Sequence, residues 1–454
     1  MGNEEKDIYV YANWGEEAKL VGILHASKQR GKETFSFEYT QEFLEAHPGF
    51  TIDPSLDAYT ARQYPSNGKT LFGAFEDSSP DRWGRVLMRR REAILAHEEK
   101  RKPSLLTESD YLLGVCDETR MGALRFKLNP NEEYVSSDKR FAAPPWTDLR
   151  VLETASIEFE NQRDPNEIKW LRQLLSPGSS LGGARPKASV VNPDGSLWIA
   201  KFPSRYDECN IGAWETITHD LAVKCGLDVP QAQIANFSKN GSTFLVKRFD
   251  RDGSRRIHTA SAMTMLGKSD GEEGVSYLDL ADKIIEISSC PEIDLRELWN
   301  RIVFSMAVSN TDDHLRNHGF IYKDNGWRLS PLYDVNPVNY GDWLSLNVDK
   351  VDSTIDFNLA ISVANDFEVT KDEAKDTVNR IAGIVREGWK PLAEHYGISR
   401  EEIMRMAPAF QEAEIGLKRI FPAKGLEQKK DQCKIASSQL NKVAETNQVD
   451  RTER

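Results

Sequence analysis

The densest group of chemically useful side chains in this sequence lies between residues 310 and 334. Asp312 is followed five residues later by Asn317, and a second aspartate, Asp334, comes after a strand-like stretch. This order is typical of kinases, in which the first aspartate meets the hydroxyl nucleophile while the asparagine and the later aspartate hold Mg²⁺. Because Mg²⁺ keeps water and phosphate oxygens as its other ligands, few protein side chains are needed. The pattern therefore favours Mg²⁺-dependent phosphoryl transfer.

Two other interpretations of this segment are open. His314 and His318 are four residues apart and, with Asp312, could ligate the metal ion of a hydrolase. The sequence has no HExxH motif and no further histidine within fifty residues, so this interpretation ranks below the kinase one. A plain polar loop explains either half of the pattern, but hardly both halves at this spacing.

A lysine closes an apolar row in the strand predicted over residues 197–202. Leu197, Ile199 and Lys201 face one way in that strand, and a lysine at the end of such a row needs a partner. Glu215, about one turn into the next predicted helix, could supply the carboxylate, as in the lysine–glutamate pair of protein kinases. The alternative is a lysine that snorkels to solvent from the strand end.

Residues 179–187, SSLGGARPK, stand immediately before another predicted strand. Gly182 and Gly183 would let the backbone approach an anion closely, and consecutive amide groups can bind phosphate oxygens. The segment is neither a Walker loop nor a GxGxxG motif. On its own it is explained at least as well by an ordinary glycine turn.

The elements that must position these residues have local signals. Alternating side chains predict strands within residues 1 to about 75, and Ser-Pro-Asp at 79–81 marks the start of a helix over 82–99. Turn residues and a proline pair place a boundary within 129–150. Beyond it we expect strands at 187–191, 197–202 and 243–249, helices at 211–225, 295–307 and 371–421, and a polar, disordered tail.

The composition excludes several classes of protein. The 454 residues include 59 basic and 71 acidic side chains, a net charge of −12, which argues against direct, sequence-independent DNA binding. The basic cluster at 85–91 is interleaved with apolar residues at helical spacing, so we expect it on a solvated helix face. No apolar run approaches the roughly 18 to 20 residues of a membrane span. Five scattered cysteines and an acidic, mixed N-terminus predict a cytoplasmic protein.

Five segments in order resemble the HipA family of bacterial serine/threonine kinases, best known as toxins of toxin–antitoxin pairs: SSLGGARPK, WIAKFPS, FLVKRFDR, SNTDDHLRNHGF and LSPLYDVNP. The kinase-like match covers about residues 176–400, and PDRWGRVLM at 80–88 resembles the family's N-terminal subdomain. The resemblance implies an α+β, two-lobed protein-kinase-like (HipA-like) fold with an extra N-terminal β-containing subdomain and a mostly helical C-lobe. Its expected parts are the N-terminal subdomain (1–150), the kinase N-lobe (151–255), the helical C-lobe (256–423) and the tail (424–454).

The resemblance also implies roles for individual residues. Asp312 is implied to be the catalytic residue, and Asn317 and Asp334 are implied to be the Mg²⁺ ligands. Glu215 and His314 are implied to be supporting residues of the same site. The implied ATP contacts are Ser180, Gly182, Gly183, Lys201, Lys247, Phe249 and Asp250, of which the last three belong to the hinge; Ser180 is also the implied autophosphorylation site. TDDHLRN and YDV stand where protein kinases have HRD and DFG. Asp313 beside Asp312 leaves the microscopic assignment of the base open.

The implied cofactors are ATP and Mg²⁺, and the implied reaction transfers the ATP γ-phosphoryl group to a serine or threonine of a protein substrate. The expected partner is a small helix-turn-helix antitoxin (HipB-like), with DNA contacted only through that partner and no contact with a membrane. Two further classes stay open. A small-molecule kinase would share the same nucleotide residues, and a weakly active binding module would act mainly through the antitoxin.

Overall fold

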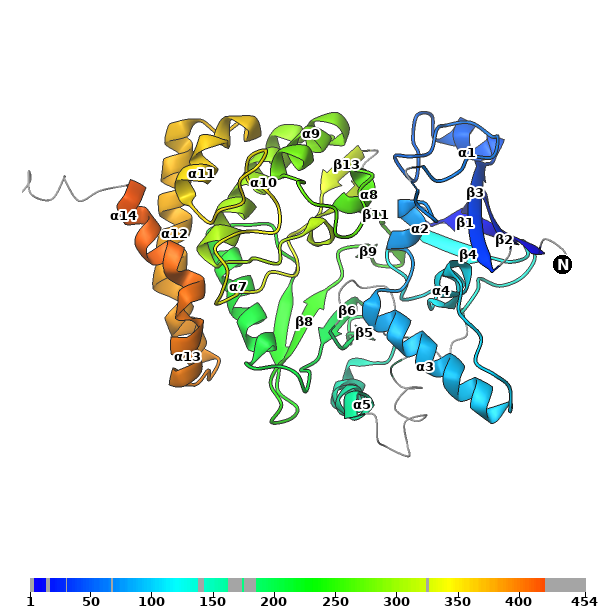
Figure 1. The fold of residues 1–454 in the computed structure, drawn as a ribbon, viewed down its shortest axis with the longest axis horizontal. Coiled ribbons are helices and arrows are strands. Elements are labelled where there is room, and N and C mark those ends of the chain that lie inside the picture. The colour runs from blue at the N-terminus through cyan, green and yellow to red at the C-terminus, as the bar shows by residue number, and fades with distance from the viewer. Residues whose placement is uncertain are drawn as a thin grey trace, which may run out of the picture.

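The computed structural model describes residues 4–13, 17–29, 31–66, 68–137, 143–161, 174, 185–323 and 326–420. The glycine-rich residues Ser180, Gly182 and Gly183 and the expected tail at 424–454 therefore lie outside the described residues. The rest has the mixed helix-and-sheet architecture expected from the sequence, with a mostly helical C-lobe (Figure 1). Among the described residues, no helix combines the length and the apolar composition needed to cross a lipid bilayer.

The first part of the chain forms a four-stranded antiparallel sheet of order β3-β2-β1-β4. Its strands are β1 (Glu4–Ala12), β2 (Lys19–Gln29), β3 (Lys32–Tyr39) and β4 (Leu124–Lys127), and its helices are α1 (Gln41–Ala46), α2 (Gly73–Asp77), α3 (Arg82–Glu98) and α4 (Glu108–Gly114). The alternation expected to about residue 75 ends at Tyr39, because Thr40 caps α1 by accepting the N–H of Phe43. Helix α3 begins as predicted, but its cap is Asp81, while Ser79 donates to the Phe75 carbonyl.

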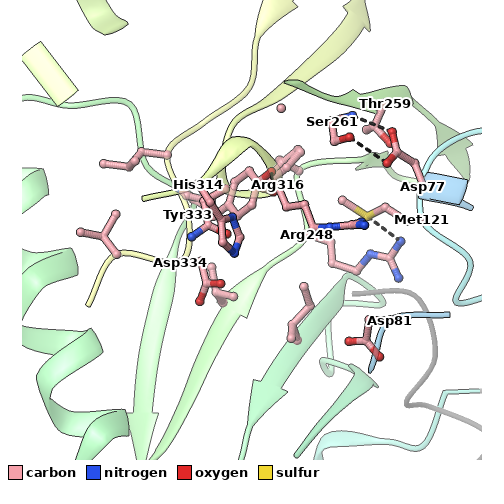
Figure 2. Close-up of a pocket in the computed structure, with 18 of the residues that line it drawn as sticks. Asp77, Asp81, Met121, Arg248, Thr259, Ser261, His314, Arg316, Tyr333 and Asp334 are labelled. Carbon is pink, nitrogen blue, oxygen red and sulfur yellow. Dashed lines mark hydrogen bonds between the residues drawn. The ribbon is translucent and has the colours of Figure 1, made fainter. Parts of the chain in front are cut away.

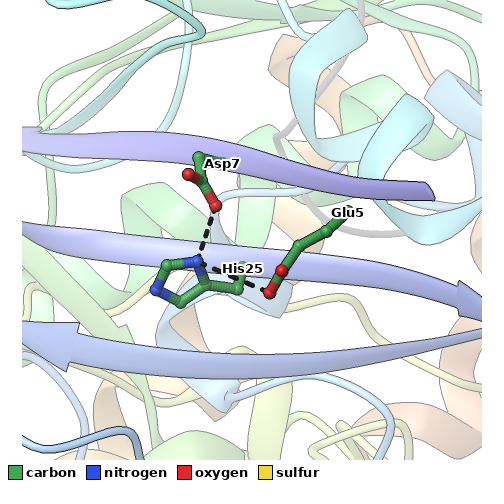
Figure 3. Close-up of side chains that lie close together, drawn as sticks. All are labelled: Glu5, Asp7 and His25. Carbon is green, nitrogen blue, oxygen red and sulfur yellow. Dashed lines mark hydrogen bonds and ion pairs between the residues drawn. The ribbon is translucent and has the colours of Figure 1, made fainter. Parts of the chain in front are cut away.

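One polar cluster joins the strands of this sheet (Figure 3). Glu5, Asp7 and His25 place one ligand-type atom each within 4.8 Å of the others, a spacing that a metal ion could bridge. The guanidinium of Arg62 already donates to Glu5 Oε1 at 2.8 Å and lies 3.2 Å from His25 Nδ1. Glu38 on β3 approaches His25 Nε2 at 3.3 Å. The cluster is therefore an ion-pair network that links three strands.

The second sheet has the antiparallel order β5-β6-β8-β7 and corresponds to the kinase-like N-lobe. Its strands are β5 (Lys187–Val191), β6 (Leu197–Lys201), β7 (Ala232–Ala235) and β8 (Thr243–Lys247), flanked by α5 (Leu149–Asn161) and α7 (Ile211–Cys225). The predicted hairpin and the helix over 211–225 are confirmed, and α7 ends at Gly226 with φ of +76°, which glycine adopts without strain. Strand β8 ends two residues earlier than predicted.

The remaining chain forms the helical C-lobe, whose core includes the fully buried Trp299 and Trp389. Its elements are a small sheet of β11 (His258–Ser261), β12 (Gly319–Lys323) and β13 (Gly326–Leu329), the β9 (Arg251–Asp252) and β10 (Arg255–Arg256) hairpin, and helices α8 (Ala262–Met265), α9 (Tyr277–Ile287), α10 (Pro291–Ala307), α11 (Phe357–Ser362), α12 (Lys371–His395), α13 (Arg400–Met406) and α14 (Leu417–Ile420). The prediction of one continuous helix over 371–421 is wrong, because α12 ends at His395, close to Gly397 with its φ of +72°. Figure 1 shows the N-terminal sheet beside the two kinase-like lobes.

Candidate active site

A cavity of about 760 Å³ lies where the N-terminal part, the second sheet and the C-lobe meet. Figure 2 shows its walls: Asp77 and Asp81 come from the N-terminal part, Arg248 follows β8, and His314 and Asp334 come from the C-lobe. Of the residues predicted from the sequence, the following line it: Lys201, Glu215, Lys247, Phe249, Asp312, His314, Asn317 and Asp334. Residues separated by more than 100 positions along the chain thus share one cavity.

Lys201 stands at the end of β6 between two carboxylates. It forms ion pairs with Glu215 on α7 and with Asp334 Oδ1, the latter at 2.5 Å. Burial alone would lower the pKa of the lysine, but the two carboxylates outweigh it and raise that pKa above its ordinary value. The lysine is therefore charged, and the predicted Lys201–Glu215 pair is present.

Asp334 follows β13 in a backbone conformation that aspartate rarely adopts. Its φ is +59°, in the left-handed region, and the next residue is held by the hydroxyl of Thr218, which donates to the Val335 carbonyl at 2.7 Å. Burial would raise the pKa of Asp334, but Lys201 overcomes this effect and the pKa falls to about 2. Asp334 is therefore a carboxylate at neutral pH, and its side chain is 37% exposed to the cavity side of the molecule.

Asp312 and Asn317 are joined in the loop after α10. The Asn317 Nδ2 donates to the Asp312 carbonyl at 3.0 Å, which leaves the Asn317 Oδ1 as the atom available to a cation. Asp312 itself is exposed at the cavity. Partial burial and the negative charge of Asp334 raise its pKa, while His314 acts in the opposite direction. A carboxylate oxygen from Asp334 and an amide oxygen from Asn317 are ligands that Mg²⁺ accepts, so these residues fit the ion.

The structure separates Asp312 from its neighbour Asp313. The Asp313 carboxylate is buried, accepts the hydroxyl of Tyr277 at 2.5 Å and lies 2.8 Å from His318 Nε2. Burial would raise its pKa, but His318 and the hydrogen bonds lower it. Asp313 therefore holds the loop in the core, and Asp312 is the aspartate that faces the cavity.

The histidine pair does not form a common metal site. His318 is fully buried against Asp313, whereas His314 lines the cavity. The intervening residues Leu315–Asn317 form a single 3₁₀ turn rather than an α-helix, so the four-residue spacing does not place both imidazoles on one face. This geometry argues against the hydrolase interpretation.

The hinge residues border an apolar part of the cavity. Lys247 and Phe249 line it, and the ring centroid of Phe249 lies 5.6 Å from that of Tyr333. Ile199 and Val246 are among the apolar side chains of the same wall. A planar, largely apolar group such as a nucleobase matches this part of the cavity.

Asp250, the remaining hinge residue, is turned away from the cavity. It is fully buried, and its oxygens accept from Arg248 Nε at 2.8 Å, Arg251 Nη1 at 2.6 Å and the Gly122 N–H at 2.8 Å. Arg248 also donates to the Thr119 carbonyl at 2.6 Å. The carboxylate therefore joins the hinge to the N-terminal part and does not line the cavity, so the structure does not support the predicted nucleotide contact of Asp250.

Replacing Asp250 with asparagine should destabilise the protein by about 3–5 kcal/mol, because two buried guanidinium groups lose their shared carboxylate. Burial opposes ionisation of Asp250, yet Arg248 and Arg251 lower its pKa below the ordinary value. This stabilisation is complete above the unfolded-state pKa of about 3.9 and is lost as the pH falls towards the folded-state pKa. Urea denaturation of the variant, with Asp376→Asn on the exposed face of α12 as control, measures the effect. Equal midpoints for the two variants would contradict it.

Sequence reasoning missed the cavity residues of the N-terminal part. Asp77, Asp81 and Arg82 line the cavity, and Asp77 accepts from the Ser261 N–H at 2.7 Å and from its hydroxyl at 2.8 Å. The Ser-Pro-Asp signal located this helix start but did not indicate which part of the chain it would face. That information is not local.

Comparisons with known proteins agree with this geometry. Two family models match: the HipA-like C-terminal domain over residues 179–389 and the HipA N-terminal domain over residues 14–127. A protein of Sinorhizobium fredii provisionally named kinase Y4mE is 32% identical over 190 residues, which covers 36% of this chain and 43% of that protein. A provisionally named kinase of Haemophilus influenzae is 29% identical over 196 residues, which covers 38% of this chain and 57% of that protein.

These matches span about half the length of the two relatives. Among solved structures, HipA of Shewanella oneidensis, in a complex with HipB and operator DNA, superposes with a TM-score of 0.59 at 17% identity. The superposition covers 91% of this chain and 97% of that one, so the two proteins share their fold.

Proposed function

The chain belongs to the HipA-like family, and from this premise we propose that it is an ATP- and Mg²⁺-dependent kinase that phosphorylates serine or threonine of a protein substrate. The observation that carries the proposal is the convergence of Lys201, Asp334 and Asp312 on one cavity. These residues come from β6 and from two separate loops of the C-lobe. A binding module without activity has no need for a charged lysine, a low-pKa carboxylate and an exposed aspartate in this arrangement.

Each residue has a defined task in the proposed reaction. Lys201, kept in place by Glu215, binds nucleotide phosphates, while Lys247 and Phe249 border the adenine. Asn317 and Asp334 hold Mg²⁺, which would neutralise the charge that develops on the phosphate oxygens. Asp312 orients the substrate hydroxyl and accepts its proton as the hydroxyl oxygen bonds to the γ-phosphorus, while the bond from that phosphorus to the β,γ-bridging oxygen breaks and ADP leaves. Burial raises the pKa of Asp312, and His314 opposes this rise, which favours the proton-accepting carboxylate.

The proposed partners follow from the fold and the resemblance. The Shewanella oneidensis protein forms a complex with HipB and operator DNA. We expect a small HipB-like helix-turn-helix protein to bind this chain, and DNA to be contacted through that protein, since the net charge of the chain is −12. A short helix-turn-helix reading frame beside the gene, and its co-purification with the chain, would support this expectation.

Incubation with γ-labelled ATP and Mg²⁺, followed by mapping of the phosphorylated residues, tests the reaction. Label on serine or threonine of a protein supports the proposal. Label transferred only to a metabolite would favour a small-molecule kinase instead. Nucleotide-independent hydrolysis, or no phosphate incorporation at all, would contradict kinase activity.

We expect self-phosphorylation at Ser180 to inactivate the enzyme. Phosphoserine would add roughly −1.5 to −2 charges and three acceptor oxygens to the glycine-rich segment. These oxygens would compete with ATP for backbone amides or draw the segment towards Arg185 or Lys187, so ATP affinity should fall. Peptide mapping after incubation with ATP, and nucleotide titration of Ser180→Asp, measure the effect. Absence of phosphate at Ser180 together with undiminished ATP binding by Ser180→Asp would contradict it.

A further inference from the structure

The segment that carries Asp334 is attached to helix α7 at two points. The Asp334 carboxylate pairs with Lys201, which in turn pairs with Glu215 on α7. Three residues later on the same helix, the Thr218 Oγ1 donates to the Val335 carbonyl at 2.7 Å. The first link acts on the side chain of the proposed metal ligand, and the second acts on the backbone of the residue that follows it.

The contact between Thr218 and Val335 lies in the interior of the protein, where both residues are buried. The Thr218 hydroxyl has two further acceptors on its own helix, the carbonyls of Glu215 at 3.0 Å and Trp214 at 3.2 Å. The Val335 carbonyl is the nearest of the three. A hydroxyl has one proton to donate, and a buried carbonyl that loses its donor costs free energy. Loss of this hydroxyl would therefore favour a movement of the Val335 backbone.

The backbone at Asp334 has a conformation that requires support. Its φ of +59° lies in the left-handed region, which is uncommon for residues other than glycine and persists where the surrounding structure holds it. Before Asp334, the Leu332 N–H donates to the Asp228 carbonyl at 2.7 Å. After Asp334, the Thr218 hydroxyl holds the next residue. The left-handed residue therefore lies between two short hydrogen bonds.

Helix α7 is itself fixed to the C-lobe, where it packs against α12 (Figure 1). The Tyr396 hydroxyl, directly after α12, donates to Asp220 Oδ2 at 2.6 Å. The Trp214 Nε1 donates to Glu402 Oε1 on α13 at 2.8 Å. These two contacts lie on either side of Thr218 along the helix, so the Thr218 hydroxyl has a defined position relative to the C-lobe.

We propose that Thr218 is a positioning residue of the reaction, whose hydroxyl holds the segment after β13 so that the Asp334 carboxylate faces the cavity. The inference rests on the proposed function and deepens it, because it gives α7 a second task besides carrying Glu215. Thr218 acts through Asp334 and not on the substrate. Residues that orient a metal ligand affect metal binding nearly as much as the ligands do.

Replacing Thr218 with valine tests the proposal, because valine keeps the branched side chain and removes only the hydroxyl. The Mg²⁺ concentration for half-maximal ATP binding should rise roughly 10–100-fold, the range typical for a residue that orients a metal ligand. The affinity for ATP without Mg²⁺ should stay close to the wild-type value, because Lys201 retains Glu215 as its partner. Calorimetric titration with ATP at a series of Mg²⁺ concentrations measures both quantities.

Thr216→Val is the matched control, because Thr216 is also buried on α7 but donates to the Gly212 carbonyl of its own helix, at 2.8 Å. Each valine variant loses one buried hydroxyl, yet only Thr218→Val should change the Mg²⁺ requirement. Thr218→Ser, which keeps the hydroxyl, should retain the wild-type requirement. If Thr218→Val does not fold, Thr218→Ala should show the same rise. A requirement equal to that of Thr216→Val would overturn the proposal.

The double variant Thr218→Val/Asp334→Asn separates a positioning role from a structural one. If Thr218 acts through the Asp334 carboxylate, the double variant should require no more Mg²⁺ than Asp334→Asn alone. A requirement raised by the product of the two single effects would show that Thr218 acts independently, and would overturn the positioning role. A wild-type protein that binds no ATP in the presence of Mg²⁺ would overturn the proposed function itself.

Discussion

Replacing Asp312 with alanine should lower the turnover number by roughly 10²–10⁴-fold and leave ATP affinity nearly unchanged. The reason is geometric: Asp312 is exposed at the cavity, and among the described residues no hydrogen bond or ion pair joins its side chain to Lys201 or Asp334, the pair that is proposed to hold the nucleotide. Steady-state phosphorylation of a protein substrate, together with calorimetric ATP titration, measures the two effects separately.

Asp270→Asn is the appropriate control for this variant. Asp270 also lines the cavity and is exposed, but it pairs with Arg82 at 3.2 Å. The Asp270→Asn variant should retain most of the activity. This result would show that the loss in Asp312→Ala is specific to Asp312 and is not a general effect of removing a negative charge near the site. Turnover of Asp312→Ala close to the wild-type value would show that the catalytic assignment is wrong.

The pH profile gives a second measure of the same residue. Burial and Asp334 raise the pKa of Asp312, and the proton-accepting form is the carboxylate. The value of kcat/KM should therefore be constant above this pKa and should fall as the pH drops through it. The fall should occur at a pH above the ordinary aspartate pKa of about 3.9. The residual activity of Asp312→Ala should lack this acidic limb. An unchanged limb in the variant would assign it to another group.

Replacing Asp334 with asparagine should produce the second large effect, a loss of Mg²⁺-dependent nucleotide binding. Asparagine tolerates the φ of +59° at this position, so the backbone is retained while the anionic ligand and the partner of Lys201 are lost. Mutation of a residue that only hydrogen-bonds to a metal ligand typically costs roughly 10–100-fold in metal affinity or activity. Because Asp334 is a proposed ligand itself, its loss should raise the Mg²⁺ concentration for half-maximal activity by at least this factor.

Titration of activity and of ATP binding with Mg²⁺ measures this effect. Asp352→Asn is the matched control, because Asp352 is half-buried in a loop where its carboxylate accepts from the N–H and the hydroxyl of Thr354. An unchanged Mg²⁺ requirement in Asp334→Asn would remove this residue from the metal site. A requirement altered equally in both variants would do the same.

The sequence by itself determined the elements whose signals are local. The hairpin 187–201 alternates with period two, and the helix 211–225 has an apolar repeat that ends at a glycine. The pairing of Lys201 with Glu215 followed from these two elements, because both residues lie in neighbouring segments of the chain. The order Asp312, Asn317, Asp334 likewise stands in one stretch of sequence.

Tertiary structure alone decided which residues of these patterns face the cavity. Asp312 and Asp313 are adjacent in the sequence, and the packing of Asp313 against Tyr277, His318 and Ser305 commits it to the core. Asp250 was expected beside the nucleotide, yet two guanidinium groups and the amide of Gly122 hold it in the contact with the N-terminal part.

The pairing of Asp81 with Lys187 shows why local sequence signals do not determine which residues meet in the folded chain. Propensity, capping and side-chain alternation act over a few residues, so they specify helices and strands. A contact across 106 positions depends on how these elements pack, and on the requirement that each buried ammonium group finds a carboxylate. That requirement is satisfied only in the folded chain, where the start of α3 meets the first residue of β5.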